Sequence, residues 1–229
     1  MYKYEMHLHS KECSACSYAT SEELIIAAKE KGYSGIVLTN HFIRGNTCID
    51  RKLPWEAFVG AYEEDYLMAK EFGLKVDMDV LFGIEEGLGK GKEILIYGLS
   101  PETIKSAPLF KSMQLPELYK FIHKNGGFAV CPHPFRHRDY IIESDKEPDL
   151  RYFDAIEVSN HCNSVEENLK ATEFAKSNGM KMIAGGDVHS ISGIGYSGLA
   201  FNERIRNSKQ LVKHLKSNKY RLIVNGQII

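Results

Sequence analysis

The stretch YEMHLHS, residues 4–10, ends an apolar run with two imidazole side chains two positions apart, His7 and His9. Near the other end of the chain, GGDVHS repeats this arrangement with Asp187 and His189. Residues two apart on an extended strand point to the same face of a sheet. Each pair can therefore present two metal-binding groups together. Imidazole combined with carboxylate suits zinc, iron or manganese better than calcium.

Between the two pairs, apolar runs alternate with amphipathic segments of helical period. The strand-like runs cover 4–9, 35–39, 76–84, 93–99, 127–131, 154–159 and 181–186. The helix-like segments cover 21–32, 55–73, 115–127, 164–179 and 208–218, and 220–224 can add a terminal strand. Repeated strand–helix units predict a mostly parallel sheet with helices outside it. Seven such strands can close into a barrel, in which the first and last strands, and hence both pairs, become neighbours.

Composition points to one domain spanning residues 1–229, since 43% of the side chains are hydrophobic, enough for one sizeable core. The chain has 29 Lys and Arg and 30 Asp and Glu, so its charges nearly cancel. This near balance disfavours a long nucleic acid or an anionic membrane as partner. The beginning MYKYEMHLHS lacks the apolar stretch of a signal peptide, and no run is long enough to span a membrane. Five cysteines, an odd number, favour a reducing compartment, so we expect a cytoplasmic protein. Without a second C-x2-C pair, Cys13 and Cys16 are interpreted as unpaired loop thiols.

Parallel sheets place their chemistry at the carboxyl ends of the strands and in the loops that follow. Reading every strand-like run to its end collects one set of polar side chains: His7, His9, His41, Glu85, His133, His161, Asp187 and His189. Glu157 lies within a strand rather than after it, so we expect it to support a ligand or to be a satisfied core carboxylate. The sequence thus predicts a metal centre at one edge of the sheet.

Five blocks in this order resemble the PHP family, the polymerase and histidinol phosphatase domain of metal-dependent phosphoesterases. The blocks are HLH at 7–9, VLTNH at 37–41, GIE at 83–85, HPF at 133–135 and GGDVH at 185–189. The resemblance implies an α/β fold, a distorted (β/α)7 TIM-like barrel. It also implies a cluster of two or three divalent ions, zinc, iron or manganese, that hydrolyses phosphate esters.

Carried over motif by motif, the resemblance assigns ligands to these ions. It places His7, His9 and Asp187 on one ion, His133 on a second, Glu85 between two ions, and His41 and His189 at the remaining position. The family often adds a residue soon after the first pair, and here Glu12 is the candidate, with a solvated loop carboxylate as the alternative. Two departures stand out. Asn40 occupies a position where the family usually shows aspartate, and EILIYGLS lacks a histidine that many members supply to the second metal.

The implied reaction is attack of a metal-bound hydroxide on a small phosphomonoester or nucleotide. Arg136 is the candidate cation for the phosphoryl oxygens, and His161 either protonates the leaving oxygen or lines the pocket. No serine or cysteine is set up with a base as a nucleophile. Two alternatives remain open, an amidohydrolase-like C–N hydrolase and a metal-binding protein without catalysis. The former commonly uses a carboxylated lysine, and the strand ends offer none. The oligomeric state and the substrate are left open.

Overall fold

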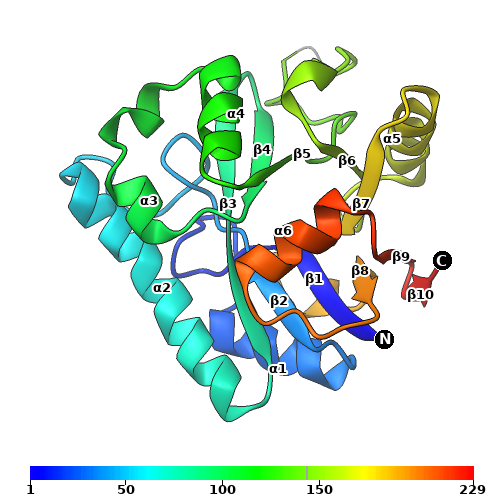
Figure 1. Ribbon diagram of the computed structural model, residues 1–229, viewed down its shortest axis with the longest axis horizontal. Coiled ribbons are helices and arrows are strands. Elements are labelled where there is room, and N and C mark those ends of the chain that lie inside the picture. Colours follow the sequence, from blue (N-terminus) through cyan, green and yellow to red (C-terminus); the bar gives the residue numbers. More distant parts are fainter. Residues whose placement is uncertain (143) are drawn as a thin grey trace.

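A strongly curled ten-stranded sheet forms the centre of the computed structural model, in which residues 1–142 and 144–229 are described (Figure 1). In spatial order the sheet runs β10-β9-β8-β1-β2-β3-β4-β5-β6-β7. The strands are β1 (Tyr2–Leu8), β2 (Gly35–Leu38), β3 (Asp79–Gly89), β4 (Lys92–Tyr97), β5 (Phe128–Cys131), β6 (Ala155–Asn160), β7 (Lys181–Gly185), β8 (Ser197–Phe201), β9 (Arg221–Val224) and β10 (Gln227–Ile228). All seven predicted core strands are present, and so is the terminal strand.

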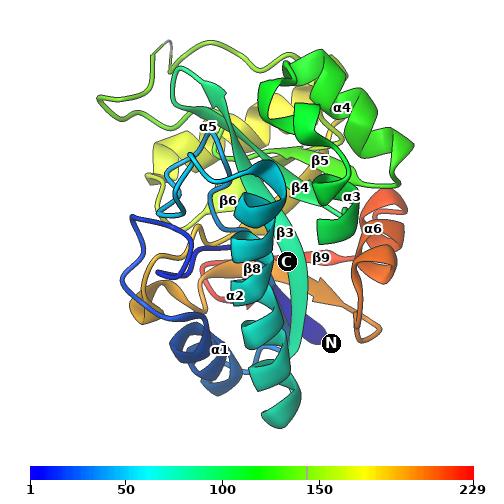
Figure 2. The ribbon, with the colours of Figure 1, turned by 90° about the vertical axis from the view of Figure 1, so that its left-hand side faces the viewer.

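Helices pack around the sheet, most of them on its outside as the strand–helix alternation predicts, while α6 lies across one end of the curl (Figure 1). They are α1 (Ser21–Glu30), α2 (Trp55–Lys75), α3 (Pro101–Lys105), α4 (Leu115–Lys124), α5 (Val165–Ser177) and α6 (Ser208–Lys216), with short 3-10 turns at Pro108–Ser112, Leu150–Tyr152 and Ile191–Gly193. Figure 2 shows α1 and α2 side by side on one flank. A capping box begins α1, where the Thr20 side chain accepts from the Glu23 amide and the Glu23 carboxylate accepts from the Thr20 amide.

The direction of the strands divides the sheet into parts. The pairs β1–β2, β2–β3, β5–β6 and β6–β7 are parallel. In contrast, β4 runs antiparallel to both β3 and β5, and β8 runs antiparallel to β1. The amino end of β4 therefore lies at the same edge of the sheet as the carboxyl ends of the parallel strands.

The curl brings the segment after β7 back to β1. Leu8 and Val188 form an isolated parallel bridge, with hydrogen bonds from the Val188 amide to the His7 carbonyl (3.0 Å) and from the His9 amide to the Val188 carbonyl (2.9 Å). The α/β class is thus confirmed, with a curled, mixed sheet. Because β4 has no helix between it and β3, the sheet departs from regular (β/α)7 alternation. The distorted closed barrel of seven units stays a prediction.

One strand of the structure was not expected from the sequence. Strand β8 was not anticipated from the sequence, because SGLAF is short and contains Gly198 with a left-handed φ of 141°. A side chain at Gly198 would meet the Tyr4 carbonyl at 2.3 Å, so the glycine allows β8 to lie against β1. No helix of the described part of the chain is long and apolar enough to cross a membrane.

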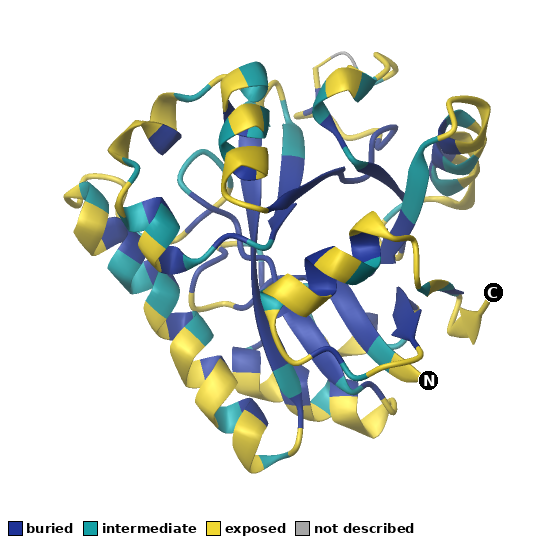
Figure 3. Cartoon of the chain, in the orientation of Figure 1, coloured by how far each residue is buried: buried dark blue, intermediate teal, exposed yellow. Residues whose placement is uncertain are grey.

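Most strand residues are buried, whereas the helices expose one face, as the colours of Figure 3 show. The buried hydrophobic side chains of strands and helices form the core. Helix α6 packs Leu211, Val212 and Leu215 against Tyr97 and Phe128, which lie at the amino-terminal edge of the parallel strands. This helix therefore covers one end of the curl. The opposite end carries the carboxyl ends of the strands and the loops predicted to hold the site.

An aromatic cluster fixes the loop after β2. Phe42 is fully buried and packs edge-on against Phe58, Tyr62 and Phe110, with ring centroids 5.2 Å, 4.9 Å and 5.5 Å away. Its neighbour in the chain is His41, one of the predicted ligands. Because edge-to-face aromatic contacts add to the burial energy, this cluster determines where His41 can lie.

We expect Phe42→Ala to lower the free energy of unfolding of the metal-free protein by about 3–5 kcal/mol, since it opens a cavity among rigid aromatic rings. Leu74→Ala is the control, because Leu74 is 75% exposed on α2 and should cost within about 0.5 kcal/mol. Urea unfolding followed by circular dichroism measures both. Similar losses for the two variants would contradict the role given to Phe42.

Candidate metal centre

The first and last predicted pairs meet at one point, as the closing bridge requires. Asp187 Oδ1 lies 3.3 Å from His7 Nε2 and 3.1 Å from His9 Nε2. All three side chains are buried. Asp187 has a left-handed φ of 52°, a conformation that is strained for a non-glycine residue and is found mostly where function requires it. The turn before His189 thus sets the direction of the Asp187 carboxylate.

Glu85 occupies the middle of the cluster. One of its oxygens lies 3.1 Å from His7 Nε2 and 3.2 Å from His133 Nε2, and the other lies 3.0 Å from His41 Nδ1 and 3.4 Å from His9 Nε2. A carboxylate whose two oxygens each face two imidazoles has the arrangement of a group shared between metal positions. The structure therefore brings together every predicted histidine and carboxylate of the strand ends except His161.

Glu93 joins the cluster although the sequence did not single it out. Its carboxylate oxygens lie 3.3 Å from His41 Nδ1 and 3.5 Å from His133 Nε2. Glu93 stands at the beginning of β4, which is antiparallel, so this end of the strand reaches the site. It brings a carboxylate to the side where the sequence lacked a histidine.

Glu157 supports the ligands from within β6. One oxygen contacts His7 Nδ1 at 2.9 Å, and the other accepts from the His133 amide at 3.0 Å and from Asn160 Nδ2 at 2.8 Å. The carboxylate thereby directs the Nε2 atom of His7 toward the cluster. This is the supporting position that the sequence favoured for Glu157.

Asn40 supports the other side through a chain of buried polar groups. Its Oδ1 accepts from Ser14 Oγ at 2.9 Å and from the Ser10 amide at 2.7 Å, and its Nδ2 donates to Asp65 Oδ2 at 2.8 Å. Ser14 Oγ in turn contacts His9 Nδ1 at 3.3 Å. The Asp65 carboxylate of α2 thus accepts a hydrogen bond from Asn40, which occupies the position where the family usually shows aspartate.

Arg136 places a buried positive charge beside the ligands. Its Nη2 lies 2.6 Å from Asp187 Oδ2, and the guanidinium also donates to Asn160 at 3.0 Å and Asn163 at 2.7 Å. Burial disfavours a charged guanidinium, but the Asp187 carboxylate outweighs this and raises the pKa of Arg136. The predicted cation is therefore held at the centre by three side chains.

The imidazoles respond differently to the shared charges. Burial alone would lower the pKa of His7, but Asp187, Glu85 and Glu157 outweigh it and raise that pKa well above its usual value. Burial is the largest effect on His9, and together with the nearby His41 imidazole it lowers the pKa of His9 to about 3. The acidic groups in the cluster thus attract positive charge, which His7 supplies when no metal ion does.

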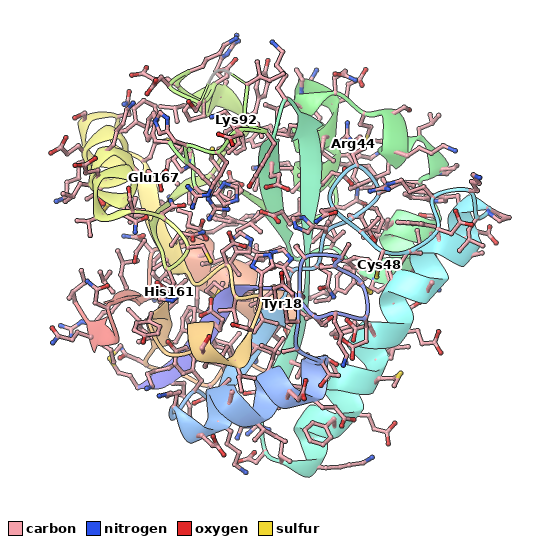
Figure 4. All side chains as sticks on the ribbon, turned by 180° about the vertical axis from the view of Figure 1, so that it is seen from behind. Tyr18, Arg44, Cys48, Lys92, His161 and Glu167 are labelled. Carbon is pink, nitrogen blue, oxygen red and sulfur yellow. The ribbon has the colours of Figure 1, made fainter. Side chains whose placement is uncertain are left out.

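Two predicted site residues lie elsewhere. Glu12 is exposed, and its carboxylate accepts from the Ser21 amide at 3.2 Å, so the structure does not bring it to the cluster. His161 is also exposed and stacks on Tyr196 with ring centroids 4.1 Å apart. Figure 4 looks onto the loop-bearing face, where His161 is labelled away from Arg44 and Lys92. The structure therefore brings neither side chain to the cluster, and their expected roles stay predictions.

The C-x2-C thiols Cys13 and Cys16 are both unpaired, as the sequence predicts, but their surroundings differ. Cys13 is buried among the hydrophobic side chains near Phe42, but the Cys16 thiol contacts the imidazoles of His41 and His189. Burial raises the pKa of Cys16, yet the hydrogen bonds to His189 and His41 prevail and lower it to about 6. The loop after β1 thus contributes Cys16, where the sequence favoured Glu12.

The donor atoms fit a metal ion in both chemistry and spacing. Among the described residues, the buried atoms His7 Nε2, His9 Nε2 and Glu85 Oε2 make no well-directed hydrogen bond, although each lies 3.0–3.4 Å from a group of the cluster that can carry the opposite charge. A bound cation would satisfy all three atoms. Ligand atoms of His7, His9 and Glu85 lie within 4.8 Å of one another, close enough for donors about 2.1 Å from one ion to share it. Side chains of the cluster also line a cavity of about 330 Å³ together with Cys16, Arg136 and Tyr140.

Comparison with known proteins supports the resemblance in sequence. The family described as PHP-associated matches residues 165–220. An uncharacterized protein of Methanocaldococcus jannaschii is 32% identical over 99 residues, which cover 40% of this chain and 41% of that protein. The matched region thus spans about two fifths of the relative's length.

Solved structures share the fold at low identity. A two-domain protein of Bacteroides vulgatus, described as containing a PHP-like metal-dependent phosphoesterase, matches 99% of this chain and 66% of its own with a TM-score of 0.73 and 15% identity. A candidate metal-dependent phosphoesterase of Bifidobacterium adolescentis matches 92% of this chain and 94% of its own, with a TM-score of 0.56 and 14% identity. An amidohydrolase of Chromobacterium violaceum, solved with sulfate and no metal, matches 82% of this chain and 87% of its own, with a TM-score of 0.51 and 17% identity. The family match and the PHP-like fold together confirm that the chain resembles the PHP family.

Proposed function

We propose that this protein is a metal-dependent phosphoesterase that hydrolyses a small phosphate ester. One observation carries the proposal: buried imidazoles and carboxylates converge with unpartnered donor atoms on a cavity that also holds the Arg136 guanidinium. Metal ligands alone would suit many reactions. A fixed cation beside them suits a substrate that brings several negatively charged oxygens.

The chain offers ligands for at least two ions. Asp187, His7 and His9 would hold one, and His133 and Glu93 a second, with Glu85 reaching both. His41 and His189 remain for a further position. Bound zinc, iron or manganese supplies activated water and neutralises charge on phosphoryl oxygens.

The remaining groups bind and orient the ester. Arg136 is held by Asp187 and two asparagines, so its charge stays in place while the substrate enters. A cavity of about 330 Å³ admits a small phosphorylated group rather than a long polymer. The near balance of acidic and basic residues likewise favours a small substrate.

The amidohydrolase of Chromobacterium violaceum keeps C–N hydrolysis as the second candidate, on fold likeness alone. Glu85 argues against it, because a glutamate occupies the centre where amidohydrolases commonly use a carboxylated lysine. The deciding experiment measures hydrolysis of phosphomonoesters, phosphodiesters and simple amides by metal-loaded protein. Turnover of amides without turnover of esters would overturn the proposal. Metal binding without any turnover would favour a protein that binds metal without catalysis.

We expect Glu85→Gln to lose bound metal and to reduce phosphoesterase activity by more than about 100-fold, because alterations merely around a metal ligand already cost about 10–100-fold. Glu86→Gln is the matched control. Glu86 points away from the cluster and accepts from the Arg44 amide and Nε, both at 3.0 Å, through an oxygen that glutamine retains. Elemental analysis and steady-state kinetics give both values. Equal metal loss in the two variants would contradict the assignment of Glu85.

We also expect Glu93→Gln to lower the metal content by about one equivalent, because the second position has few other side-chain ligands. The ion on His7, His9 and Asp187 should remain. Glu64→Gln, on the exposed face of α2, is the control and should retain all bound metal. Metal content is measured after dialysis at a fixed free zinc concentration. Full occupancy in Glu93→Gln would show that Glu93 is a bystander.

A further inference from the structure

Two cysteines from separate loops lie beside the same imidazole. Cys16, in the loop after β1, contacts His189 and His41, and Cys162, in the loop after β6, contacts His189. Cys162 Sγ also donates to the Asp187 carbonyl at 3.2 Å, where His189 Nδ1 likewise lies 2.8 Å away. Cys162 also groups with Asp187 and His189, with ligand atoms within 4.8 Å of one another. Cys16 differs in lying beside the imidazole of His41 as well as that of His189.

The backbone holds Cys16 in this place. The Ala15 amide donates to the Asn46 carbonyl at 2.9 Å, and the Tyr18 amide donates to the His189 carbonyl at 2.8 Å. Ser17 Oγ reaches the same His189 carbonyl at 3.1 Å. The loop is thus fastened on both sides of Cys16, to the loop after β2 and to the turn after β7. Its thiol is positioned before any ion binds.

The surroundings of Cys16 contain other donor atoms without partners. The donor atoms of His9, His41 and His189 lie within 4.8 Å of one another. Of these, His9 Nε2 and His41 Nδ1 are buried and have no hydrogen-bond partner among the described residues. Cys16 lines the same cavity as His41, Asp187 and His189. The thiol therefore shares this cavity with donor atoms of three imidazoles.

We propose that Cys16 is a metal ligand, supplying a thiolate to the ion that His41 and His189 hold. This inference rests on the metal centre of the proposed function and adds the identity of one ligand and a metal preference. A thiolate is a soft ligand that favours zinc and disfavours manganese, whereas imidazoles and carboxylates alone accept both. The position at His41 and His189 should therefore select zinc.

The test uses Co²⁺ as a spectroscopic substitute for zinc in the reduced, full-length protein. Co²⁺ bound by a thiolate shows a sulfur-to-cobalt charge-transfer band in the near ultraviolet. We expect this band in the unaltered protein and in Cys162→Ser, and its loss in Cys16→Ser. Zinc affinity at one position, measured by competition with a chelator, should fall by more than about 10-fold in Cys16→Ser.

A second variant separates ligation from folding. Cys16→Asp supplies a hard oxygen donor, so it should bind an ion at this position but prefer manganese relative to the unaltered protein. A charge-transfer band that persists in Cys16→Ser, or that disappears only in Cys162→Ser, would overturn the inference. Co²⁺ binding without any such band would overturn it as well and leave the phosphoesterase proposal standing. A protein that binds no metal would remove both.

Discussion

The hydrogen bonds that join β1 to the segment after β7 are the constraint on which the site depends. The backbone of Val188 pairs with His7 and His9, and the Glu5 carboxylate accepts from the Gly186 amide at 2.6 Å as well as from the His7 amide at 3.1 Å. The buried Glu5 carboxylate thus links the backbone of β1 to the backbone that follows β7. Without this closure, the ligands from the two ends of the chain would lie on separate edges of the sheet.

The direction of the strands explains which ligands the sequence could predict. Reading each strand to its carboxyl end located His41, Glu85 and His133, because the parallel strands all finish at one edge. The same rule missed Glu93, since β4 is antiparallel and presents its first residues there. The signal was nevertheless in the sequence. The run GLGKGK forms a tight turn with left-handed φ at 89–91, and such a glycine-rich turn between two apolar runs predicts a hairpin.

Loop residues were the least predictable part of the site. Glu12 had the better metal-binding side chain for a family that uses hard ligands, but Cys16 reaches the imidazoles because hydrogen bonds to Asn46 and His189 set the path of the loop. Those bonds join residues far apart in the sequence, and no local pattern encodes them. His161 likewise lies outside the cluster, although it follows a strand end. A strand end indicates an edge of the sheet but not the direction of the loop that follows. The His161 ring stacks on the Tyr196 ring.

The two departures from the family pattern compensate each other in charge. Asparagine at position 40 removes a negative charge that an aspartate would carry, and Glu93 adds one on the side where a neutral histidine is expected. Glu93 places its charge beside His41 and His133. Asp65 keeps a carboxylate behind Asn40, separated from the ligands by hydroxyl and amide groups. Because buried charges act strongly over these distances, the number of carboxylates around the cluster would limit how many dications it could hold.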